Sequence, residues 1–269
     1  MDAREVLSAV AALGPFFAVS TEPADEAGWR PLVDLYTDPD PLRARIAHVR
    51  DVLDTDDRVA ASIAFQGLAA RILSAPLAAA AVHGVVPLLT AQAVSFRAGD
   101  ESPWPLRCPE PAAVPASDPA AAAAALADLL LDGHLAPLAA AVRAQVRVSQ
   151  RLLWGNVASS VAAGRRLVGE RWPDAARPAA AIAEHLLTTG PLAGSGELLP
   201  ARPPDREWTF RRHSCCLYYR VPGGGLCGDC VLDAIPATRR GQIPRPAGPV
   251  RTTDEARALA RAMRDDERF

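Results

Sequence analysis

The sequence predicts a mainly helical protein, with a small antiparallel hairpin or sheet and a cysteine-rich loop near the C-terminal end. An α+β arrangement stays open. Three observations favour this fold class. Apolar residues recur at helical spacing over long stretches, alanine is abundant and is the best helix former, and only short stretches alternate as strands do. The chain has 269 residues, of which 49% are hydrophobic and 22% charged, as is typical of a globular protein.

Several helices are expected in the first third of the chain, joined by a polar, turn-rich loop at 20–31. Proline is tolerated in a first helical turn, and aspartate side chains cap helix starts, so Pro41 and the aspartates of 54–57 mark two helix starts. Pro76 separates the third helix from a short fourth one that stops at Gly84. The expected helices span 2–13, 41–53, 58–74 and 76–83.

The pattern changes after residue 87. Residues 90–97 partly alternate and end at Gly99-Asp100, which predicts a strand and a turn. A second strand at 105–108 would complete a hairpin. Cys108 lies there, far from the other cysteines, and is expected to be a buried structural thiol.

Helices are expected again in the second half. Asp118-Pro119 begins a helix over 120–131 that Asp132-Gly133 ends. Another begins at Pro137 and continues helically through 154–168 to Trp172, and 178–187 forms one more. No internal repeat of fixed period is present.

These elements predict four regions. Residues 1–187 form a helical body that contains the substrate-binding region, and 188–207 are a linker rich in glycine and proline. Residues 208–235 are the cysteine segment. Residues 236–269 are a C-terminal extension, with arginines spread over 236–251 and a short helix at 253–264.

Charge and cysteine content exclude some classes of protein. The formal net charge is −2 and every basic residue is arginine, which argues against a nucleic-acid binder held by positive charge. The N-terminus does not resemble a secretory signal, and proline and glycine interrupt the least charged stretch, 72–96. Clustered cysteines do not resemble a secreted disulfide scaffold. We expect a cytoplasmic monomer, and leave peripheral membrane association open.

Four cysteines are concentrated in one segment: Cys215, Cys216, Cys227 and Cys230. Thiolates select zinc or iron–sulfur clusters over hard cations. Structural zinc usually takes two C-x(2–4)-C knuckles, and only Cys227–Cys230 is one, because adjacent side chains of an extended chain point to opposite faces. A [2Fe–2S] cluster is larger and accommodates an adjacent pair more easily. Zinc and disulfides remain alternatives. The glycine run at 223–225 allows close backbone approach to the sulfurs.

The pattern Cys-Cys-x10-Cys-x2-Cys resembles the cluster-binding segment of the FhuF-type ferric-siderophore reductases, over about residues 208–233. Leu153-Trp154-Gly155-Asn156 is similar to a family feature of the helical body. Trp154 and Asn156 are expected to have structural roles there. A C-terminal extension departs from the family pattern, in which the cysteines lie close to the end.

The resemblance implies a [2Fe–2S] cluster held by the four cysteines, and an enzyme that reduces Fe(III) in a ferric siderophore to Fe(II) in one-electron steps to release iron. The chain has no recognisable nicotinamide or flavin motif, so a donor such as a ferredoxin or a reductase would supply the electrons. Two other functions stay open: a non-catalytic helical protein with a structural four-cysteine zinc site, and an electron-transfer module for another enzyme.

Five residues near the cysteines are candidates to tune a cluster or contact a substrate: Arg211, Arg212, His213, Tyr218 and Arg220. Positive charge would raise the reduction potential of a cluster or attract an anionic chelate. The alternative for each arginine is an exposed side chain in an arginine-rich protein. For the tyrosine, packing is the alternative, because aromatic side chains bury large areas.

Overall fold

The computed structural model describes residues 2–23, 27–100, 102–116 and 118–236. The expected arginine-rich stretch and the helix at 253–264 lie outside these residues.

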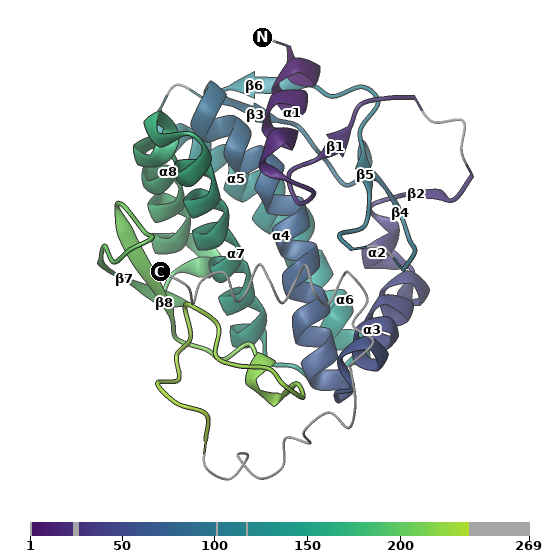
Figure 1. Ribbon diagram of the computed structural model, residues 1–269. Coiled ribbons are helices and arrows are strands. Elements are labelled where there is room, and N and C mark those ends of the chain that lie inside the picture. Colours follow the sequence, from purple (N-terminus) through teal and green to yellow (C-terminus); the bar gives the residue numbers. More distant parts are fainter. Residues whose placement is uncertain (1, 24–26, 101, 117, 237–269) are drawn as a thin grey trace.

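Two long helices, α4 (Asp57–His83) and α7 (Gln150–Arg171), lie side by side at the centre of the molecule (Figure 1). Helix α8 (Ala176–Thr188) packs against both, and α3 (Pro39–Leu53) packs against α4. Most residues of α4 are buried, including the alanine run Ala78–Ala81. The core is therefore a helix-on-helix packing around α4, and the mainly helical fold class is confirmed.

The remaining helical elements surround this pair. Aspartate or serine side chains cap several of the helices: Asp2, Asp38, Asp56, Asp118 and Ser149. Of these, Asp118 and a cap within 54–57 were predicted from the sequence. The outer elements are α1 (Ala3–Val10), α2 (Asp34–Thr37), α5 (Pro119–Leu126), the π-helical η2 (Ala127–Leu135) and α6 (Ala136–Gln145).

Two expected helix ends are wrong, and one helix that was expected to be continuous is broken. Helix α4 continues through Pro76, because one missing N–H is outweighed by burial on all sides of the helix. The chain stays helical through Gly133 as η2, where buried leucines offset the low helix propensity of glycine. Between α6 and α7 the helix breaks: Val146 is extended, and the Ser149 side chain accepts the Leu152 N–H at 3.1 Å.

Short strands form two small sheets beside the helices. The four-stranded sheet has the order β1-β5-β4-β2, from β1 (Val19–Ser20), β2 (Trp29–Pro31), β4 (Ser95–Arg97) and β5 (Leu106–Arg107). Strands β4 and β5 are antiparallel, which confirms the expected hairpin, although residues 91–93 form a turn rather than strand. Strands β1 and β2 were not expected, because two or three residues are too few for alternation to be recognised. Strand β3 (Val85–Pro87) pairs with β6 (Ala113–Pro115).

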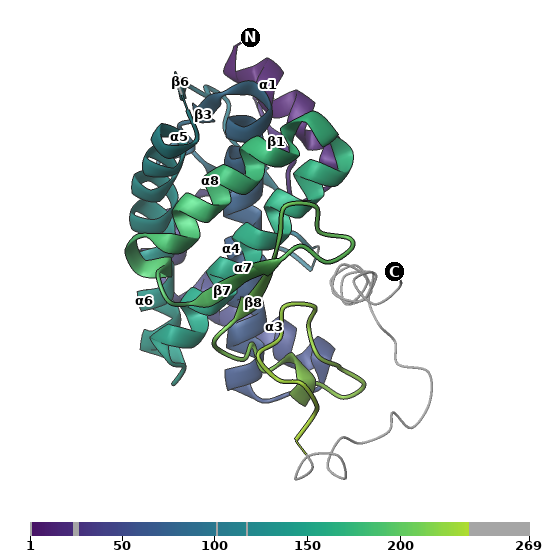
Figure 2. The same cartoon turned by 90° about the vertical axis from the view of Figure 1, so that its left-hand side faces the viewer.

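A final hairpin connects the helical core to the cysteine segment. Strand β7 (Gly196–Pro200) pairs antiparallel with β8 (Trp208–Arg212), and the hairpin lies against α7 (Figure 2). Strand β8 alternates strictly, so Trp208, Phe210 and Arg212 are buried. Residues 188–207 thus include a strand and the 3-10 turn η4 (Gly190–Leu192), while the division of the chain into four regions stays a prediction.

Two stretches of the described residues are long and apolar enough to cross a membrane by length and composition alone: Asp57–His83 and Pro119–Gln145. The most apolar window of the first is 83% buried, because α4 is the central helix of the core. Its apolar composition is therefore accounted for by packing within the protein.

Candidate metal centre

The four clustered cysteines converge on one site. Their sulfurs form a ring in which Cys215 contacts Cys216 and Cys230, and Cys227 contacts the same two residues. The Cys216 and Cys227 sulfurs are 3.7 Å apart. Cys216 and Cys227 are buried, while Cys215 and Cys230 are partly exposed. Cys108 is buried in the helical body, as expected, and burial raises the pKa of its thiol.

A sharp bend brings both members of the adjacent pair to one side. Leu217 has φ +71°, a left-handed conformation that is rare for a residue with a side chain. The chain then closes through the 3-10 turn η5 (Tyr218–Arg220). A side chain at Gly224 would place its Cβ 2.5 Å from the Tyr218 carbonyl oxygen. Only glycine therefore fits where the chain folds back against Tyr218.

Backbone amides point at the sulfurs. The Leu217 N–H donates to Cys215 Sγ at 3.3 Å, and the Leu232 N–H donates to Cys230 Sγ at 3.4 Å. The Tyr218 N–H donates to the Cys216 sulfur. Such hydrogen bonds stabilise thiolates and tune the potential of a bound cluster.

Crowding of the sulfurs perturbs their pKa values in an alternating way. Hydrogen bonds from the Cys215 and Cys227 thiols lower the pKa of Cys216 far below its ordinary value, and hydrogen bonds from the same two thiols lower the pKa of Cys230. Hydrogen bonding to those two thiolates raises the pKa of Cys215 and Cys227. Adjacent thiolates repel one another, so four deprotonated cysteines at this separation require bound positive charge.

A buried arginine connects the pair Cys215-Cys216 to the central helices. Arg212 is 0% exposed; its Nε donates to the Ser214 carbonyl and its Nη2 donates to Asn156 Oδ1 on α7 at 2.5 Å. Asn156 Nδ2 donates to the carbonyl and hydroxyl oxygens of Ser62 on α4, at 2.9 and 3.0 Å. The Ser62 hydroxyl in turn donates to the Cys216 carbonyl at 2.7 Å. One polar chain thus runs from the arginine through both helices to a cysteine.

Gly155 allows this close approach. A Cβ at this position of α7 would lie 2.1 Å from Ser214 Oγ and 3.2 Å from Arg212 Nη2. Gly155 and Asn156 therefore form the contact of α7 with the cysteine segment. The glycine leaves space for the Ser214 side chain, and the asparagine accepts a hydrogen bond from Arg212.

The knuckle Cys227–Cys230 is held from the same helix. The Ser159 hydroxyl of α7 donates to the Asp229 carboxylate, and the Arg212 N–H donates to the Asp229 carbonyl at 3.0 Å. Burial raises the pKa of Asp229, which the positive charge of Arg212 opposes. Arg212 thus contacts both halves of the cysteine segment.

Of the other predicted neighbours, two form ion pairs that fasten the segment. Arg211 bonds Asp233 at 2.8 Å, beyond the last cysteine, and Arg220 bonds Asp56, the N-cap residue of α4, at 2.6 Å. His213 is exposed, and its Nδ1 lies 3.1 Å from the Gly194 carbonyl oxygen. Tyr218 is buried, 9% exposed. Their assignment to substrate or cluster contact stays a prediction.

Ser62, Ser159 and the link from Asn156 to Arg212 were missed from the sequence. A usable signal was present: Asn156 is the only asparagine of the chain, and its nearest neighbours in the helix, Trp154, Gly155, Val157 and Ala158, carry no side-chain amide or charge. Buried polar side chains are rare unless they are hydrogen-bonded, so a lone asparagine at a core position indicates a specific partner.

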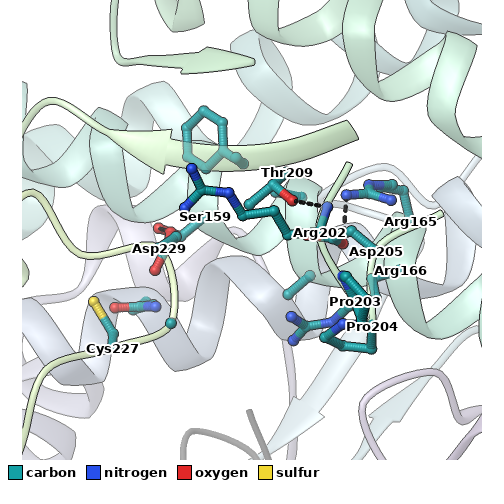
Figure 3. Close-up of a pocket in the computed structure, with 15 residues that line it drawn as sticks. Ser159, Arg165, Arg166, Arg202, Pro203, Pro204, Asp205, Thr209, Cys227 and Asp229 are labelled. Atoms are coloured by element: carbon teal, nitrogen blue, oxygen red, sulfur yellow. Dashed lines mark hydrogen bonds and ion pairs between the residues drawn. The ribbon is translucent and has the colours of Figure 1, made fainter. Parts of the chain in front are cut away.

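A cavity of about 300 Å³ adjoins the knuckle (Figure 3). Its walls come from α7, from the 201–209 region and from the knuckle itself, with Cys227, Gly228 and Asp229 among the lining residues. Arg165, Arg166 and Arg202 also line it. Arg165 donates to Asp205 at 2.7 Å and stacks over Trp208, with its Cζ 3.9 Å from the ring centroid. A molecule in this cavity would lie against a cysteine of the ring.

The donor set fits a [2Fe–2S] cluster. Four sulfurs, including an adjacent pair that one ion accommodates poorly, surround a common centre, and amide N–H groups point at three of them. Among the described residues, no group of three or more His, Cys, Asp and Glu side chains has the arrangement of a ready site for a single metal ion. Cys215, Cys216, Cys227 and Cys230 are the residues that would hold the cluster.

Comparison with protein families agrees with this chemistry. Residues 65–206, just over half of the chain, match the family described as "Ferric iron reductase FhuF-like transporter". Residues 212–232, which contain all four clustered cysteines, match "FhuF 2Fe-2S C-terminal domain". No curated protein matches the chain. The chain therefore belongs to the FhuF-like ferric iron reductase family, and its cofactor is a [2Fe–2S] cluster.

Proposed function

We propose that this ferric iron reductase acts on ferric siderophores, and that it transfers one electron to each Fe(III) so that Fe(II) is released. The observation that carries the proposal is the cavity beside the cysteine ring, because Cys227 and Asp229 form part of its wall. A chelate bound there would lie next to a cluster ligand. Electron transfer requires a short distance between the cluster and the bound Fe(III). It does not require a side chain to make or break a bond to the substrate.

The electron balance defines what else is needed. A bound [2Fe–2S] cluster supplies one electron at a time. Siderophores hold Fe(III) through hard oxygen donors, and the added electron yields the softer Fe(II), which those donors hold less tightly. Each turnover consumes one electron, so an external donor such as a ferredoxin or a reductase must replace it.

The exposure of the four cysteines supports separate binding places for the electron donor and the chelate. Cys216 and Cys227 are buried, and Cys227 faces the cavity, whereas Cys215 and Cys230 are partly exposed. The donor protein would approach the outer edge while the chelate occupies the cavity. We also propose that the protein is a cytoplasmic monomer, since iron is released where reducing donors are present.

Anaerobic reoxidation tests the proposal. Dithionite-reduced protein is mixed with one equivalent of a ferric siderophore, the visible spectrum is followed, and Fe(II) is trapped with a specific chelator. We expect the oxidised spectrum to return with one Fe(II) formed per electron stored. The Cys108→Ser variant is the matched control, because this buried thiol lies outside the ring.

Two results would contradict the proposal. Reoxidation by unrelated acceptors as fast as by ferric siderophores, at equal driving force, would instead favour an electron-transfer module for another enzyme. A colourless protein with stoichiometric zinc would contradict the cluster itself.

A further inference from the structure

A second cavity, of about 420 Å³, adjoins the one beside the cysteine ring. The two share lining residues from both central helices, including Gln66 of α4 and Ser159 and Ala163 of α7. They are therefore two lobes of one groove. We call the lobe that includes Cys227 the head lobe, and the lobe that includes Phe16 and Leu167 the arm lobe.

The arm lobe has an apolar lining. Leu13, Pro15, Phe16, Phe17, Ala70 and Leu167 contribute hydrocarbon surface to it. Leu167 is 41% exposed, and among the described residues it is the one exposed large hydrophobic side chain.

The hydroxyls of the arm lobe are already bonded. Ser74 Oγ donates to the Ala70 carbonyl at 2.6 Å, and Ser160 Oγ donates to the Asn156 carbonyl at 3.0 Å. Arg166 and Glu170 pair with each other at 3.8 Å. The lobe therefore offers a ligand few free polar partners, and such a space favours hydrocarbon over polar groups.

The head lobe differs in character. Arg202 lines it and has no side-chain hydrogen bond or ion pair to any described residue, so its guanidinium is free to bond an oxygen-rich ligand. The Gln66 side chain is likewise without a partner among the described residues, and it lies where the two lobes meet. Polar groups for a metal-binding head thus lie beside the ring, and an apolar channel leads away from them.

From this arrangement we propose that the groove binds an amphiphilic ferric chelate, with its oxygen-donor head in the head lobe and a hydrocarbon arm in the arm lobe. The inference rests on the proposed function, and it deepens that function by naming the chemical class of the substrate.

Gly67 provides a clean way to fill the arm lobe. It lines this lobe from α4 but not the head lobe, and a Cβ built on it would meet nothing within 4 Å. Gly67→Phe should therefore occupy the lobe without disturbing the core. Gly67→Ala is the matched control, because alanine adds little volume and favours a helix more than glycine does.

The test measures binding separately from electron transfer. Two chelates have the same hydroxamate head, and one of them also carries a linear eight-carbon acyl chain. Both are loaded with Ga(III), which the cluster does not reduce, so that binding is measured without electron transfer. Their dissociation constants for the full-length, cluster-loaded protein are measured by calorimetry. We expect the chain to strengthen binding at least tenfold in the wild type and in Gly67→Ala, and less than twofold in Gly67→Phe. The chelate without the chain should bind all three proteins equally.

Leu167→Asn changes an exposed side chain, so it should not disturb folding. It should also reduce the preference for the chelate with the acyl chain, and it replaces Gly67→Phe in the test if that variant does not fold. Equal affinity of the wild type for both chelates would overturn the inference and leave the arm lobe to another occupant. Gly67→Phe weakening both chelates alike would overturn it too. In either case, continued reoxidation of the reduced protein by the Fe(III) chelates would leave the proposed function standing.

Discussion

Replacing Asn156 with alanine tests the polar connection between the cysteine segment and the helical core. The substitution removes the acceptor 2.5 Å from Arg212 Nη2 and both bonds to Ser62. Arg212 is 0% exposed, so water cannot replace the lost acceptor, and its Nη1 already lacks a partner among the described residues. A hydrogen bond to a charged group contributes about 2 kcal/mol and the bonds to Ser62 together about 1 kcal/mol. The free energy of unfolding should therefore fall by about 3 kcal/mol, a large part of the stability of a typical domain.

Urea unfolding followed by circular dichroism measures this change, and visible absorption in the same samples reports the cluster. Ser160→Ala is the matched control. Among the described residues its buried hydroxyl, one turn along α7, bonds only the Asn156 carbonyl, at 3.0 Å, so the substitution should cost about 1 kcal/mol or less. Asn156→Ala should also lose its cluster at a lower urea concentration. Equal losses of stability in the two variants would refute the reasoning, because they would mean that the buried guanidinium is not left without a partner.

The remaining predictions concern the ring, the close contact beside it and a buried histidine. Cys216→Ser should lose the visible spectrum and most of the iron while Cys108→Ser keeps both, because only the first thiol belongs to the ring; an unchanged spectrum in Cys216→Ser would remove it from the ligand set. Gly155→Ala would place a Cβ 2.1 Å from Ser214 Oγ. Overpacking should cost about 1–3 kcal/mol and outweigh the gain of about 1 kcal/mol in helix propensity, so the urea midpoint should fall. A raised midpoint would contradict this contact. Burial lowers the pKa of His134 below its ordinary value of 6.5, so the unfolded chain takes up more protons and stability should fall as the pH drops below about 6.5, by up to about 1.4 kcal/mol per pH unit. His134→Gln should flatten that slope in urea titrations at several pH values, and an unaltered slope would exclude His134 as its cause.

Much of the helical body could be predicted from the sequence because its signals are local. Proline in a first turn marks the start of α3, and aspartates mark the starts of α4 and α5. The periodicity of 58–74 identifies a buried face. Where local signals compete with burial, burial decides the outcome. Pro76 and Gly133 both favour a helix end, yet both lie inside helical structure, because the surrounding side chains are packed in the core.

From its residues alone, the cysteine segment indicates a thiolate site and favours a [2Fe–2S] cluster over zinc or disulfides. Four cysteines with an adjacent pair restrict the cofactor, since adjacent residues of an extended chain cannot both face one small ion. The spacing also carried the family resemblance, which the family comparison confirms.

How that segment is held, and what adjoins it, depends on contacts between residues far apart in the chain. The left-handed Leu217 turns the pair, and Arg212 reaches Asn156 and the Cys227–Cys230 knuckle across long stretches of sequence. The groove between α4 and α7 likewise exists only when the helices pack, because its residues come from segments that share no local pattern. A ligand set within one short segment is a local property of the chain, whereas the contacts that support it and the space beside it depend on where distant helices lie.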